Sequence, residues 1–423
     1  MAADPARFLT DCYRRHGPVF RVRLLSREYP VIAGAEAALF LGSDQGRENL
    51  RSREFWQGLA DEFGAGRTLV GEDGASHAEL RDLMRRGYSR AAVEGRLGEL
   101  VTITDRHIDR VWRPGTAVPV LAAMQRLVTD QLGDLVAGAA RPEYVADIRL
   151  FTRWLLNALV IRQWPRVLLR DPRYRHAKAR VVELSHRIVD DRSAGLGGPA
   201  PLVDDLLRAH RDDPGRMPAG DLAAALIGPF VAGLDTVANT TAAFVYAVLK
   251  HPEVHQRVVA EADRLFAGGD ITDADLSDLP ALRGALMETM RLYPIAVAQM
   301  RTATRDFTFE GHRIAAGETV LLGTSVPHFL PEHYPHPERF DIDRYSKPRV
   351  EHRQPGAYSP YGRGPHLCLG KALAEVQMLV TMGRLLHRCD LRLDPPGYTL
   401  ARRSSPTPGP APSFRVRVDG HRH

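Results

Sequence analysis

The sequence predicts a mainly helical fold with a small β-rich lobe, and three observations lead to this prediction. From Ala35 to about Phe266, apolar residues recur at three- and four-residue spacings, which is typical of amphipathic helices. The stretch Asp221–Lys250 is apolar nearly all round, so a helix of this length, roughly 45 Å, should lie in the middle of the molecule. Residues 18–34 and 295–325 instead carry the pattern of short strands.

The elements follow one another without a long linker. The segment VFRVRLLSREYPVIAG alternates apolar and polar residues around a Ser/Arg/Glu turn, which predicts a β-hairpin. Helical segments come next, for example DRHIDRVW, MQRLVTDQLGDLVAGA and LFTRWLLNALVIRQW. After the central helix, ALRGALMETMRLYP predicts a second helix that ends at Pro294.

The last third of the chain mixes strands with irregular structure. FTFEGHRIAAGETVLLG predicts short strands, and a Pro/His-rich stretch from Val326 to Pro360 predicts an irregular segment. A helix should run from about Leu369 to Arg388, and the alternating tail FRVRVDG should pair with another strand. We therefore expect a single domain, residues 1–423, whose β-rich lobe combines residues 18–34, residues 295–325 and the C-terminal strands.

Composition narrows the class of protein. The 423 residues are 44% hydrophobic, enough for a large core, and charge interrupts the apolar segments, so we expect no membrane partner. The start of the chain lacks the pattern of a secretory signal. Three widely spaced cysteines, Cys12, Cys368 and Cys389, argue against a disulfide framework and a zinc site and favour a reducing, cytoplasmic location.

The charge pattern bears on partners. The net charge is +6, and the basic residues are scattered among acidic ones, so nucleic-acid binding is not indicated. A modest basic face for an acidic protein partner is compatible with this balance.

The stretch SPYGRGPHLCLGKALAEVQM places a lone cysteine in a Gly-rich loop just before a helix. A thiolate is a good ligand for haem iron, and glycines such as Gly362 permit turns and close backbone approach. At the start of the next helix, Cys368 should have a lowered pKa because the helix macrodipole stabilises the thiolate. The alternative is a free, buried cysteine in a turn.

The order Tyr361-x-x-Gly364-x-His366-x-Cys368-x-Gly370 closely resembles the haem-binding loop of the cytochrome P-450 family. That loop usually begins with Phe, so the hydroxyl of Tyr361 could add a hydrogen bond near the sulfur and tune the redox potential. The resemblance implies the cytochrome P-450 fold, with haem b between the long central helix and the cysteine-loop helix. It also implies that Cys368 is the axial iron ligand and that Gly364 and Gly370 contact the cofactor.

Glu288 and Arg291 lie three residues apart in METMRLYP and so share one helical face. On its own this spacing is compatible with a solvated ion pair of little energetic value. The later segment HPERF offers Arg339 as a second arginine for the same carboxylate. By resemblance to the family, Glu288, Arg291 and Arg339 form a structural network that holds the haem loop.

The central helix contains AGLDTVANTT, in which Gly233, Asp235 and Thr236 have poor helix propensity. The resemblance implies that Asp235 and Thr236 are an acid–alcohol pair that delivers protons to bound dioxygen, beside Ala232 and Gly233. The alternative is a local bend, with the Thr236 hydroxyl bonded back to a carbonyl one turn earlier. Pro229 predicts a kink just upstream.

Haem propionates need cationic or donor partners, and GASHAELRDLMRR supplies a candidate pair. Its Ser76-x-x-Glu79 spacing predicts a capping box that starts a helix, with His77 and Arg81 on one face. His-x-x-x-Arg at this place resembles the family pattern for propionate contacts. Arg301 and His366 match the two remaining family positions, although each of these residues could be a plain surface charge.

The resemblance spans nearly the whole chain and implies a haem-thiolate monooxygenase that uses dioxygen to hydroxylate a hydrophobic small molecule, in bacterial secondary metabolism. Since no flavin-binding segment is evident, electrons should come from a separate ferredoxin or flavodoxin with its reductase, and we expect a monomer. A basic dock for that partner would use Arg85, Arg86, Arg90, Arg363 and Lys371.

Other functions stay open at this point. A peroxide-using enzyme and a desaturating or coupling oxidase could use the same scaffold, and a haem gas sensor or carrier would need no turnover. The expected substrate pocket combines apolar and aromatic residues that could equally be plain core: Phe55, Trp56, Leu59, Phe63, Trp154, Leu155, Phe230, Ile295, Val297 and Met300. They favour a hydrophobic substrate without identifying it.

Overall fold

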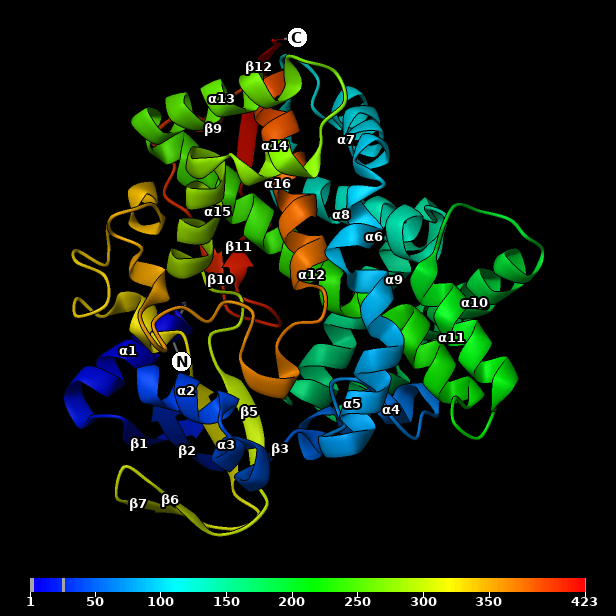
Figure 1. Cartoon of the computed structure of the whole chain (residues 1–423), viewed down its shortest axis with the longest axis vertical. Coiled ribbons are helices and arrows are strands. Elements are labelled where there is room, and N and C mark those ends of the chain that lie inside the picture. The colour runs from blue at the N-terminus through cyan, green and yellow to red at the C-terminus, as the bar shows by residue number, and fades with distance from the viewer. Residues whose placement is uncertain (1–3, 25–26, 423) are drawn as a thin grey trace.

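A computed structural model describes residues 4–24 and 27–422, and helices dominate these residues (Figure 1). The α-helices are α1 (Pro5–His16), α2 (Ala35–Gly42), α3 (Asp44–Asn49), α4 (Arg53–Phe63), α5 (Gly74–Met84), α6 (Arg90–Glu94), α7 (Leu97–Val111), α8 (Val120–Ala137), α9 (Val145–Leu155), α10 (Pro172–Ser193), α11 (Pro201–Asp212), α12 (Ala219–Lys250), α13 (Pro252–Phe266), α14 (Asp273–Ser277), α15 (Pro280–Leu292) and α16 (Lys371–Arg388). The mainly helical fold class is confirmed.

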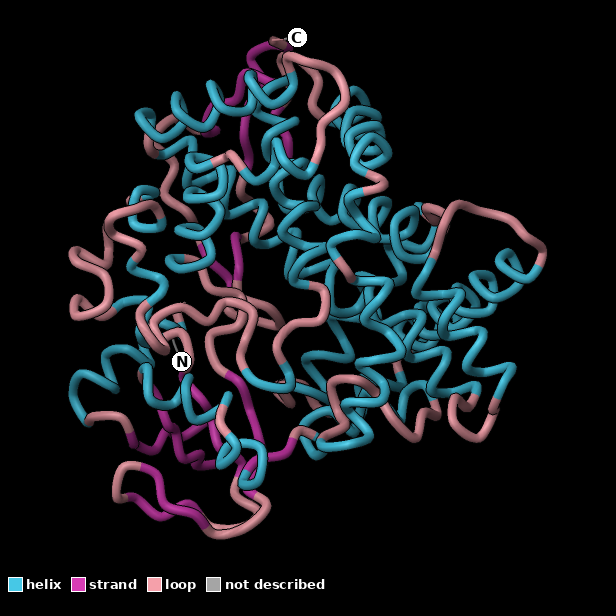
Figure 2. The backbone as a smooth tube through the Cα atoms, viewed as in Figure 1, coloured by secondary structure: helices cyan, strands magenta, loops and turns pink. Residues whose placement is uncertain are grey.

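The strands are short. They are β1 (Val19–Leu24), β2 (Arg27–Ala33), β3 (Leu50–Arg51), β4 (Ala117–Pro119), β5 (Gln299–Ala303), β6 (Phe307–Phe309), β7 (His312–Ile314), β8 (Thr319–Gly323), β9 (Cys389–Asp394), β10 (Arg402–Arg403), β11 (Gly409–Pro410) and β12 (Arg415–His421). In Figure 2 they gather mainly below and above a helical middle.

Helix α12 lies in the middle of the molecule, as its apolar sequence predicts, and it runs through Pro229 without interruption (Figure 1). Its length and composition would also suit a membrane span, but most of that stretch is buried in the core. Helix α8 packs closely against it. A Cβ atom added to Gly233 would lie 3.1 Å from Leu132 Cδ1, so glycine at this position lets the two helices approach each other.

A five-stranded sheet forms the lower end of the molecule, with strand order β1-β2-β8-β5-β3. Strands β1 and β2 form the predicted hairpin in antiparallel register, with Leu24 opposite Arg27. Arg27 and Glu28 belong to the second strand rather than to the predicted turn, and the rest of that turn, residues 25–26, lies outside the described residues. Strand β2 pairs in parallel with β8, which joins the early chain to the region after residue 295.

The C-terminal strands do not join this lobe. Strand β12 pairs with β9 and β4 in a separate three-stranded sheet at the opposite end of the molecule (Figure 1). The tail thus finds a partner strand, as its alternation predicts, but the sequence pattern held no information on which strand that would be.

Candidate active site

The middle of α12 is open on one side. Between Gly220 and Leu249, every residue of this helix is buried or half-buried except Ala232 and Thr236, which are exposed. These two residues lie four apart and so share one face of the helix. Exposure at two positions of a core helix requires a hollow beside them, and they are two of the positions that the sequence predicted for dioxygen activation.

The cysteine loop forms a tight structure before α16. The Cys368 N–H donates to the Tyr361 carbonyl at 2.9 Å, and the sulfur-bearing side chain is exposed. Gly362 and Gly364 have φ angles of 76° and 70°, and a Cβ atom on Gly364 would lie 2.7 Å from the Leu41 carbonyl oxygen. Glycine is therefore required where the loop passes α2.

The expected lowering of the Cys368 pKa is wrong for the protein without a cofactor. Desolvation by surrounding protein atoms raises the pKa of this thiol, although the Gly370 N–H and the charge of Arg81 act in the opposite direction. Helix α16 begins only at Lys371, so the thiol lies short of the first helical residue. The start of α16 therefore does not lower the pKa of this thiol below its usual value.

Tyr361, which replaces the usual Phe, lies with its ring beside Lys371, whose Nζ is 5.6 Å from the ring centroid. Burial, and then the charges of Glu375 and Cys368, raise the pKa of the Tyr361 hydroxyl well above its usual value. The side chain is therefore neutral at physiological pH. Its effect on the redox potential stays a prediction.

A set of polar side chains, which we call the Arg301 cluster, lies next to the loop and consists of Ser52, Asp73, His77, Arg301 and His366. The His366 Nε2 contacts Asp73 Oδ1 at 2.9 Å and Ser52 Oγ at 3.3 Å, and the His366 and His77 ring centroids are 4.2 Å apart. Burial by itself would raise the pKa of Asp73, but hydrogen bonds from His366 and the Ser52 N–H hold this pKa below its usual value. Burial lowers the pKa of His77 to about 4, so its imidazole is neutral near pH 7.

Arg301 is buried, and the charge of Asp73 acts on it only from beyond ion-pair distance. Its guanidinium donates to the Met300 carbonyl at 2.8 Å and to Gln299 Oε1 at 3.0 Å, and no carboxylate of the described chain lies within ion-pair distance. Burial lowers the pKa of Arg301 to about 10. Arg81 is half-buried nearby and donates to the Leu367 carbonyl at 2.8 Å. A buried cation of this kind calls for an anionic ligand, so the site suits a carboxylate-bearing group such as a haem propionate.

The predicted capping box at Ser76 is wrong. Helix α5 begins at Gly74 with Asp73 before it, so Ser76 lies inside the first turn, and its buried hydroxyl has no hydrogen-bond partner in the described part of the chain. Glu79 instead bonds to Arg67 at 3.0 Å and to Arg216. The helix thus starts three residues earlier than predicted, and the Asp73 carboxylate before it does not cap it but is engaged with His366 and the Ser52 N–H.

A fully buried ion network joins α15 to the irregular segment that follows β8. Arg291 donates to both oxygens of Glu288, with Nε to Oε2 at 2.7 Å and Nη2 to Oε1 at 2.8 Å. Arg344 Nε donates to Glu288 Oε1 at 3.1 Å, and its Nη1 donates to Glu351 Oε2 at 2.8 Å. We call these residues, Glu288, Arg291, Arg344 and Glu351, the Glu288 network.

The prediction of Arg339 as the third member is therefore wrong. The Arg339 side chain is exposed, and only its carbonyl takes part, accepting from Arg291 Nη2 at 3.2 Å. Arg344, five residues later, occupies the position because a 3₁₀ turn (Ile342–Tyr345) directs it inward, whereas Arg339 follows a tight turn at His336, where φ is 51°.

The Glu288 network is connected to the start of the cysteine loop. Arg291 Nη1 donates to the His328 carbonyl, and His328 Nε2 accepts from the Ser359 N–H at 3.3 Å. Tyr358 donates to the Met287 carbonyl of α15 at 3.0 Å. These contacts fix the start of the loop to α15.

Asp235 and Thr236 point in different directions. The Asp235 carboxylate accepts from Gln125 Nε2 of α8 at 2.7 Å and is buried. The Thr236 hydroxyl donates to the Ala232 carbonyl at 2.8 Å and also contacts the Gly233 carbonyl at 3.3 Å. The back-bonded alternative therefore describes Thr236 as it stands, while Asp235 faces away from it toward α8.

The predicted pocket residues fall into two groups. Phe55, Trp56, Phe63, Ile295 and Met300 are half-buried, whereas Trp154, Phe230 and Val297 are buried. The Trp154 ring stacks on Tyr174 with ring centroids 5.9 Å apart and meets Trp164 edge-on at 5.7 Å. Packing against these two rings is sufficient to explain the burial of Trp154.

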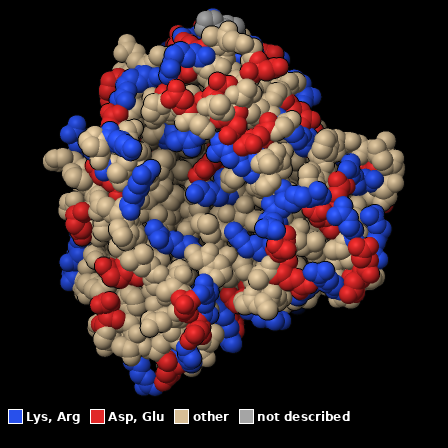
Figure 3. Space-filling model, in the orientation of Figure 1, with Lys and Arg blue, Asp and Glu red and all other residues tan. Residues whose placement is uncertain are grey.

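Lys and Arg side chains surround a hollow in the middle of the face shown in Figure 3, the face that the cysteine loop crosses in Figure 1. Of the five residues predicted to form a dock, three are paired: Arg85 with Asp82 at 2.9 Å, Arg86 with Asp205 at 2.6 Å, and Arg90 with Asp273. Arg363 and Lys371 form no ion pair among the described residues.

Sequence reasoning missed several residues of the site. The sequence does not distinguish Asp73 from an ordinary helix cap, because a single carboxylate before a helix is common. It does not identify Gln125 either, because nothing in the sequence of α8 shows that this side chain faces α12. Arg344 and Glu351 lie in an irregular segment without periodicity, so only the excess of charge in DIDRYSKPRVEH could have drawn attention to them.

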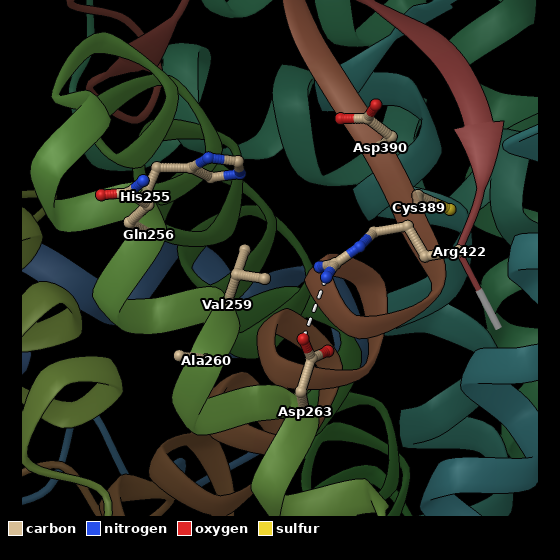
Figure 4. Close-up of a pocket in the computed structure, with 8 residues that line it drawn as sticks. All are labelled: His255, Gln256, Val259, Ala260, Asp263, Cys389, Asp390 and Arg422. Carbon is tan, nitrogen blue, oxygen red and sulfur yellow. Dashed lines mark hydrogen bonds and ion pairs between the residues drawn. The ribbon is translucent and has the colours of Figure 1, made fainter.

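A separate cavity of about 360 Å³ lies between α13 and β9 (Figure 4). Arg422 reaches across it to Asp263 at 2.9 Å. None of the predicted site residues lines this cavity, so it is distinct from the candidate site.

Comparison with known proteins agrees with the geometry. The family model described as Cytochrome P450 matches residues 2–401. A Mycobacterium tuberculosis protein with the provisional name cytochrome P450 139 is 26% identical over 399 residues, 91% of this chain and 90% of that protein. Cyclooctat-9-en-7-ol 5-monooxygenase of Streptomyces melanosporofaciens is 33% identical over 54% of this chain and 50% of its own length. Sterol 14alpha-demethylase of Mycolicibacterium vanbaalenii is 32% identical over 52% and 50%.

Solved structures share the fold. A retinoic acid-bound cyanobacterial CYP120A1 superposes with a TM-score of 0.84 at 23% identity, over 99% of this chain and 95% of its own. The heme domain of cytochrome P450DA gives a TM-score of 0.85 at 21% identity, over 100% and 94%. With the cysteine loop, the Glu288 network and the open face of α12 in place, this chain belongs to the cytochrome P450 family and is an oxidoreductase of the monooxygenase type.

Proposed function

We propose that the protein is a haem b monooxygenase that hydroxylates a hydrophobic small molecule with dioxygen, in bacterial secondary metabolism, and takes electrons from a separate ferredoxin or flavodoxin. One observation carries this proposal: on the otherwise buried helix α12, only Ala232 and Thr236 are exposed, so an interior hollow borders the residues that would act on dioxygen. Cys368 is exposed in a loop fixed to α15 and α2.

The chain's own residues would hold the cofactor as follows. Cys368 would ligate iron through its sulfur, and Gly364 and Gly370 would let the macrocycle lie close to the backbone. One propionate would supply the anion that pairs with Arg301, and His77, Arg81 and His366 would donate hydrogen bonds at the same edge. When bound, thiolate-ligated haem supplies the activation of dioxygen.

Asp235 and Thr236 would handle protons. In the structure the Thr236 hydroxyl donates to the Ala232 carbonyl, and rotation about χ1 would turn this donor toward the hollow. Asp235 would replace the proton that Thr236 donates, after leaving its contact with Gln125 Nε2. Supply of protons at this point favours productive use of dioxygen over release of peroxide.

The substrate would lie against the half-buried aromatic residues of α4, among them Phe55 and Trp56, which meet edge-on with ring centroids 5.2 Å apart. Such walls suit an apolar molecule rather than a sugar or nucleotide. Support comes from two curated relatives whose names describe oxidation of a cyclooctatenol and a sterol, both largely apolar.

Electrons would enter on the face around the cysteine loop. Arg363 and Lys371 are free of carboxylate partners in the described structure, so they are the members of the predicted dock best able to bind an acidic electron donor. The other three predicted dock residues would lie at most at the edge of this surface, because each is already paired with a carboxylate: Arg85, Arg86 and Arg90.

Two measurements test the proposal. The reduced protein with carbon monoxide should absorb as a thiolate-ligated haem, and Cys368→Ala should abolish that spectrum; a histidine-type spectrum would contradict the assignment. With a surrogate ferredoxin and a ligand that shifts the haem spectrum, Thr236→Ala should release several-fold more peroxide per electron pair. Turnover with peroxide as fast as with dioxygen would favour the peroxide-using alternative.

A further inference from the structure

Two arginines beside the middle of α12 carry charge that the chain itself does not neutralise. Arg149 lies on α9, and Arg403 lies on β10. The Arg149 side chain makes no hydrogen bond or ion pair in the described structure, and the Arg403 side chain makes one long hydrogen bond, from Nη2 to Asn239 Oδ1 at 3.3 Å. The Arg403 Nε is buried and has no partner among the described residues.

Protein atoms surround both of these side chains. Desolvation lowers the pKa of Arg149, and the charge of Asp235 offsets this effect only in part. Desolvation likewise lowers the pKa of Arg403. Even so, Arg149 is exposed and Arg403 is half-buried. Because an arginine on an open outer face would keep its ordinary pKa, accessible surface together with desolvation indicates that both side chains face a recess between elements.

The balance of charge around this recess is positive. The charges of Arg126 and Arg153 also act on Arg149, and that of Arg153 acts on Arg403 as well. Asp235 is the carboxylate whose charge acts on both arginines, but it accepts its hydrogen bond from an amide side chain of α8 at 2.7 Å. No carboxylate of the described chain lies within ion-pair distance of these four arginines. Because a cation withdrawn from water needs an anion, the recess suits an anionic ligand.

Polar contacts hold the walls of the recess together. Helix α9 and strand β11 both contact α12. The Ser405 hydroxyl, between β10 and β11, donates to Asn157 Oδ1 at 2.6 Å, and Asn157 belongs to the π-helical turn (Leu156–Val160) that continues α9. A Cβ atom on Gly409 of β11 would overlap Asn239 Oδ1, so glycine lets this strand lie directly against α12. The elements that carry the two arginines are therefore fixed relative to one another, which lowers the entropic cost of binding a ligand.

The recess lies next to the residues that would act on dioxygen. Asn239, which accepts from Arg403, follows Thr236 by three positions, or about 4.5 Å along the axis of α12, and so lies on an overlapping face of the helix. Ala232 and Thr236 are the exposed residues of that helix. An anion held by Arg149 and Arg403 would therefore leave an attached apolar body free to extend along α12 toward Thr236.

We propose that Arg149, Arg153 and Arg403 bind a carboxylate of the substrate, so that the enzyme oxidises apolar molecules that carry one carboxylic acid group. This inference rests on the proposed function, because it describes the substrate of that same site. The guanidinium groups would bind the carboxylate through charge-assisted hydrogen bonds, and the aromatic residues of α4 would contact the apolar body. The substrate would thus be an amphiphile with a charged end rather than a wholly apolar molecule.

Calorimetric titration of the haem-loaded, full-length protein tests this proposal with matched ligands: decanoic acid with 1-decanol, and abietic acid with abietinol. In a buffer without chloride or phosphate, at a pH where the acids are ionised, at least one acid should bind about tenfold more tightly than its alcohol. Arg149→Gln/Arg403→Gln should weaken binding of that acid by at least about tenfold and change binding of the alcohol by less than about twofold, which also shows that the variant is folded. Arg149→Lys/Arg403→Lys keeps both charges and should restore most of the preference for the acid.

A matched control separates this site from general attraction of an anion. Arg113→Gln/Arg211→Gln removes the same charge from exposed positions in other parts of the fold and should change binding of the acid by less than about twofold. Equal losses in the two glutamine variants, or acids that bind no more tightly than their alcohols or not at all, would overturn the proposal.

Two further readings distinguish the source of the anion and the underlying function. Added phosphate should compete with the acid; if phosphate instead tightens binding of the alcohol, a free anion fills the recess and the assignment to the substrate is wrong. The carbon monoxide spectrum of the same sample reports separately on the proposed function. A preference for acids without a thiolate-type spectrum would contradict that function and leave the carboxylate site standing, whereas a thiolate-type spectrum without the preference would overturn the carboxylate site alone.

Discussion

The Glu288 network and the Arg301 cluster both bury arginine, but they balance its charge differently. In the network, two arginines meet two glutamates, and the carboxylate of Glu288 also accepts from the Tyr345 hydroxyl at 2.7 Å and the Asp341 N–H at 3.0 Å. In the cluster, the guanidinium of Arg301 has only neutral acceptors. The chain completes the first site by itself, whereas an external anion would complete the second under the proposed function.

This difference separates structural charge from functional charge. A buried ion pair with every hydrogen bond satisfied holds a scaffold, whereas a buried cation without an anion is retained at a cost in stability and therefore indicates a ligand. Substitutions in the two sites should accordingly differ in their effect on folding, although both should weaken cofactor binding.

The largest effect is expected for Glu288→Ala. This change leaves Arg291 and Arg344 as uncompensated buried cations, which should lower the free energy of unfolding by about 3–5 kcal/mol and leave the protein largely without haem. Urea unfolding and the haem-to-protein ratio measure both consequences. Glu338→Ala, an exposed position nearby, is the control; a stable Glu288→Ala protein with full haem content would contradict this account.

A comparison of Arg344→Ala with Arg339→Ala tests which arginine completes the network. Arg344→Ala should cost about 3 kcal/mol because Glu288 and Glu351 each lose a buried partner. Arg339→Ala should cost less than about 0.5 kcal/mol because the side chain is exposed and only its backbone carbonyl is used. Equal costs in denaturant unfolding would show that the two residues share the role.

Arg301→Leu should separate cofactor binding from folding. The substitution removes a buried charge that only Asp73 opposes, from beyond ion-pair distance, so the free energy of unfolding of the cofactor-free chain should stay nearly the same or rise. Haem should be lost faster to a scavenger protein, by a factor that corresponds to roughly 1.5–3 kcal/mol for a charged hydrogen bond. Arg291→Leu is the contrasting variant, because it should destabilise the chain itself; lower chain stability in Arg301→Leu would refute the distinction.

The smallest effect concerns pH and His328, which links the Glu288 network to Ser359. Burial lowers the pKa of His328 to about 3, from an ordinary value of 6.5. Below pH 6.5 the unfolded chain binds a proton there that the folded chain does not, so stability falls as the pH falls. Between pH 6.5 and 5.5 this histidine should cost about 1 kcal/mol.

His328→Gln should therefore flatten the pH dependence of unfolding in this range, while its amide oxygen can still accept from the Ser359 N–H. His312→Gln, at an exposed position in β7, is the control and should leave the slope unchanged. An unchanged slope in His328→Gln would mean that the histidine is not held neutral by the fold.

The sequence by itself determined the parts of this protein that depend on local order. Periodicity predicted the central helix, alternation predicted the hairpin, and the spacing around Cys368 predicted the cysteine loop with its glycines. These features are encoded by residues a few positions apart, so their pattern survives without knowledge of the fold. The pairing of Glu288 with Arg291 is also encoded locally, because residues three positions apart lie on the same face of one helix.

Only the tertiary structure decided which distant groups meet. It selected Arg344 over Arg339, placed Gln125 against Asp235 from another helix, and brought Asp73 to His366 across nearly 300 residues. It also divided the described strands among four sheets and left Arg301 without a carboxylate at ion-pair distance in the described structure. These contacts depend on which side chains are buried and on which distant segments meet. A charged residue in an irregular segment belongs to no periodic pattern, so neither its burial nor its partner can be predicted from the sequence.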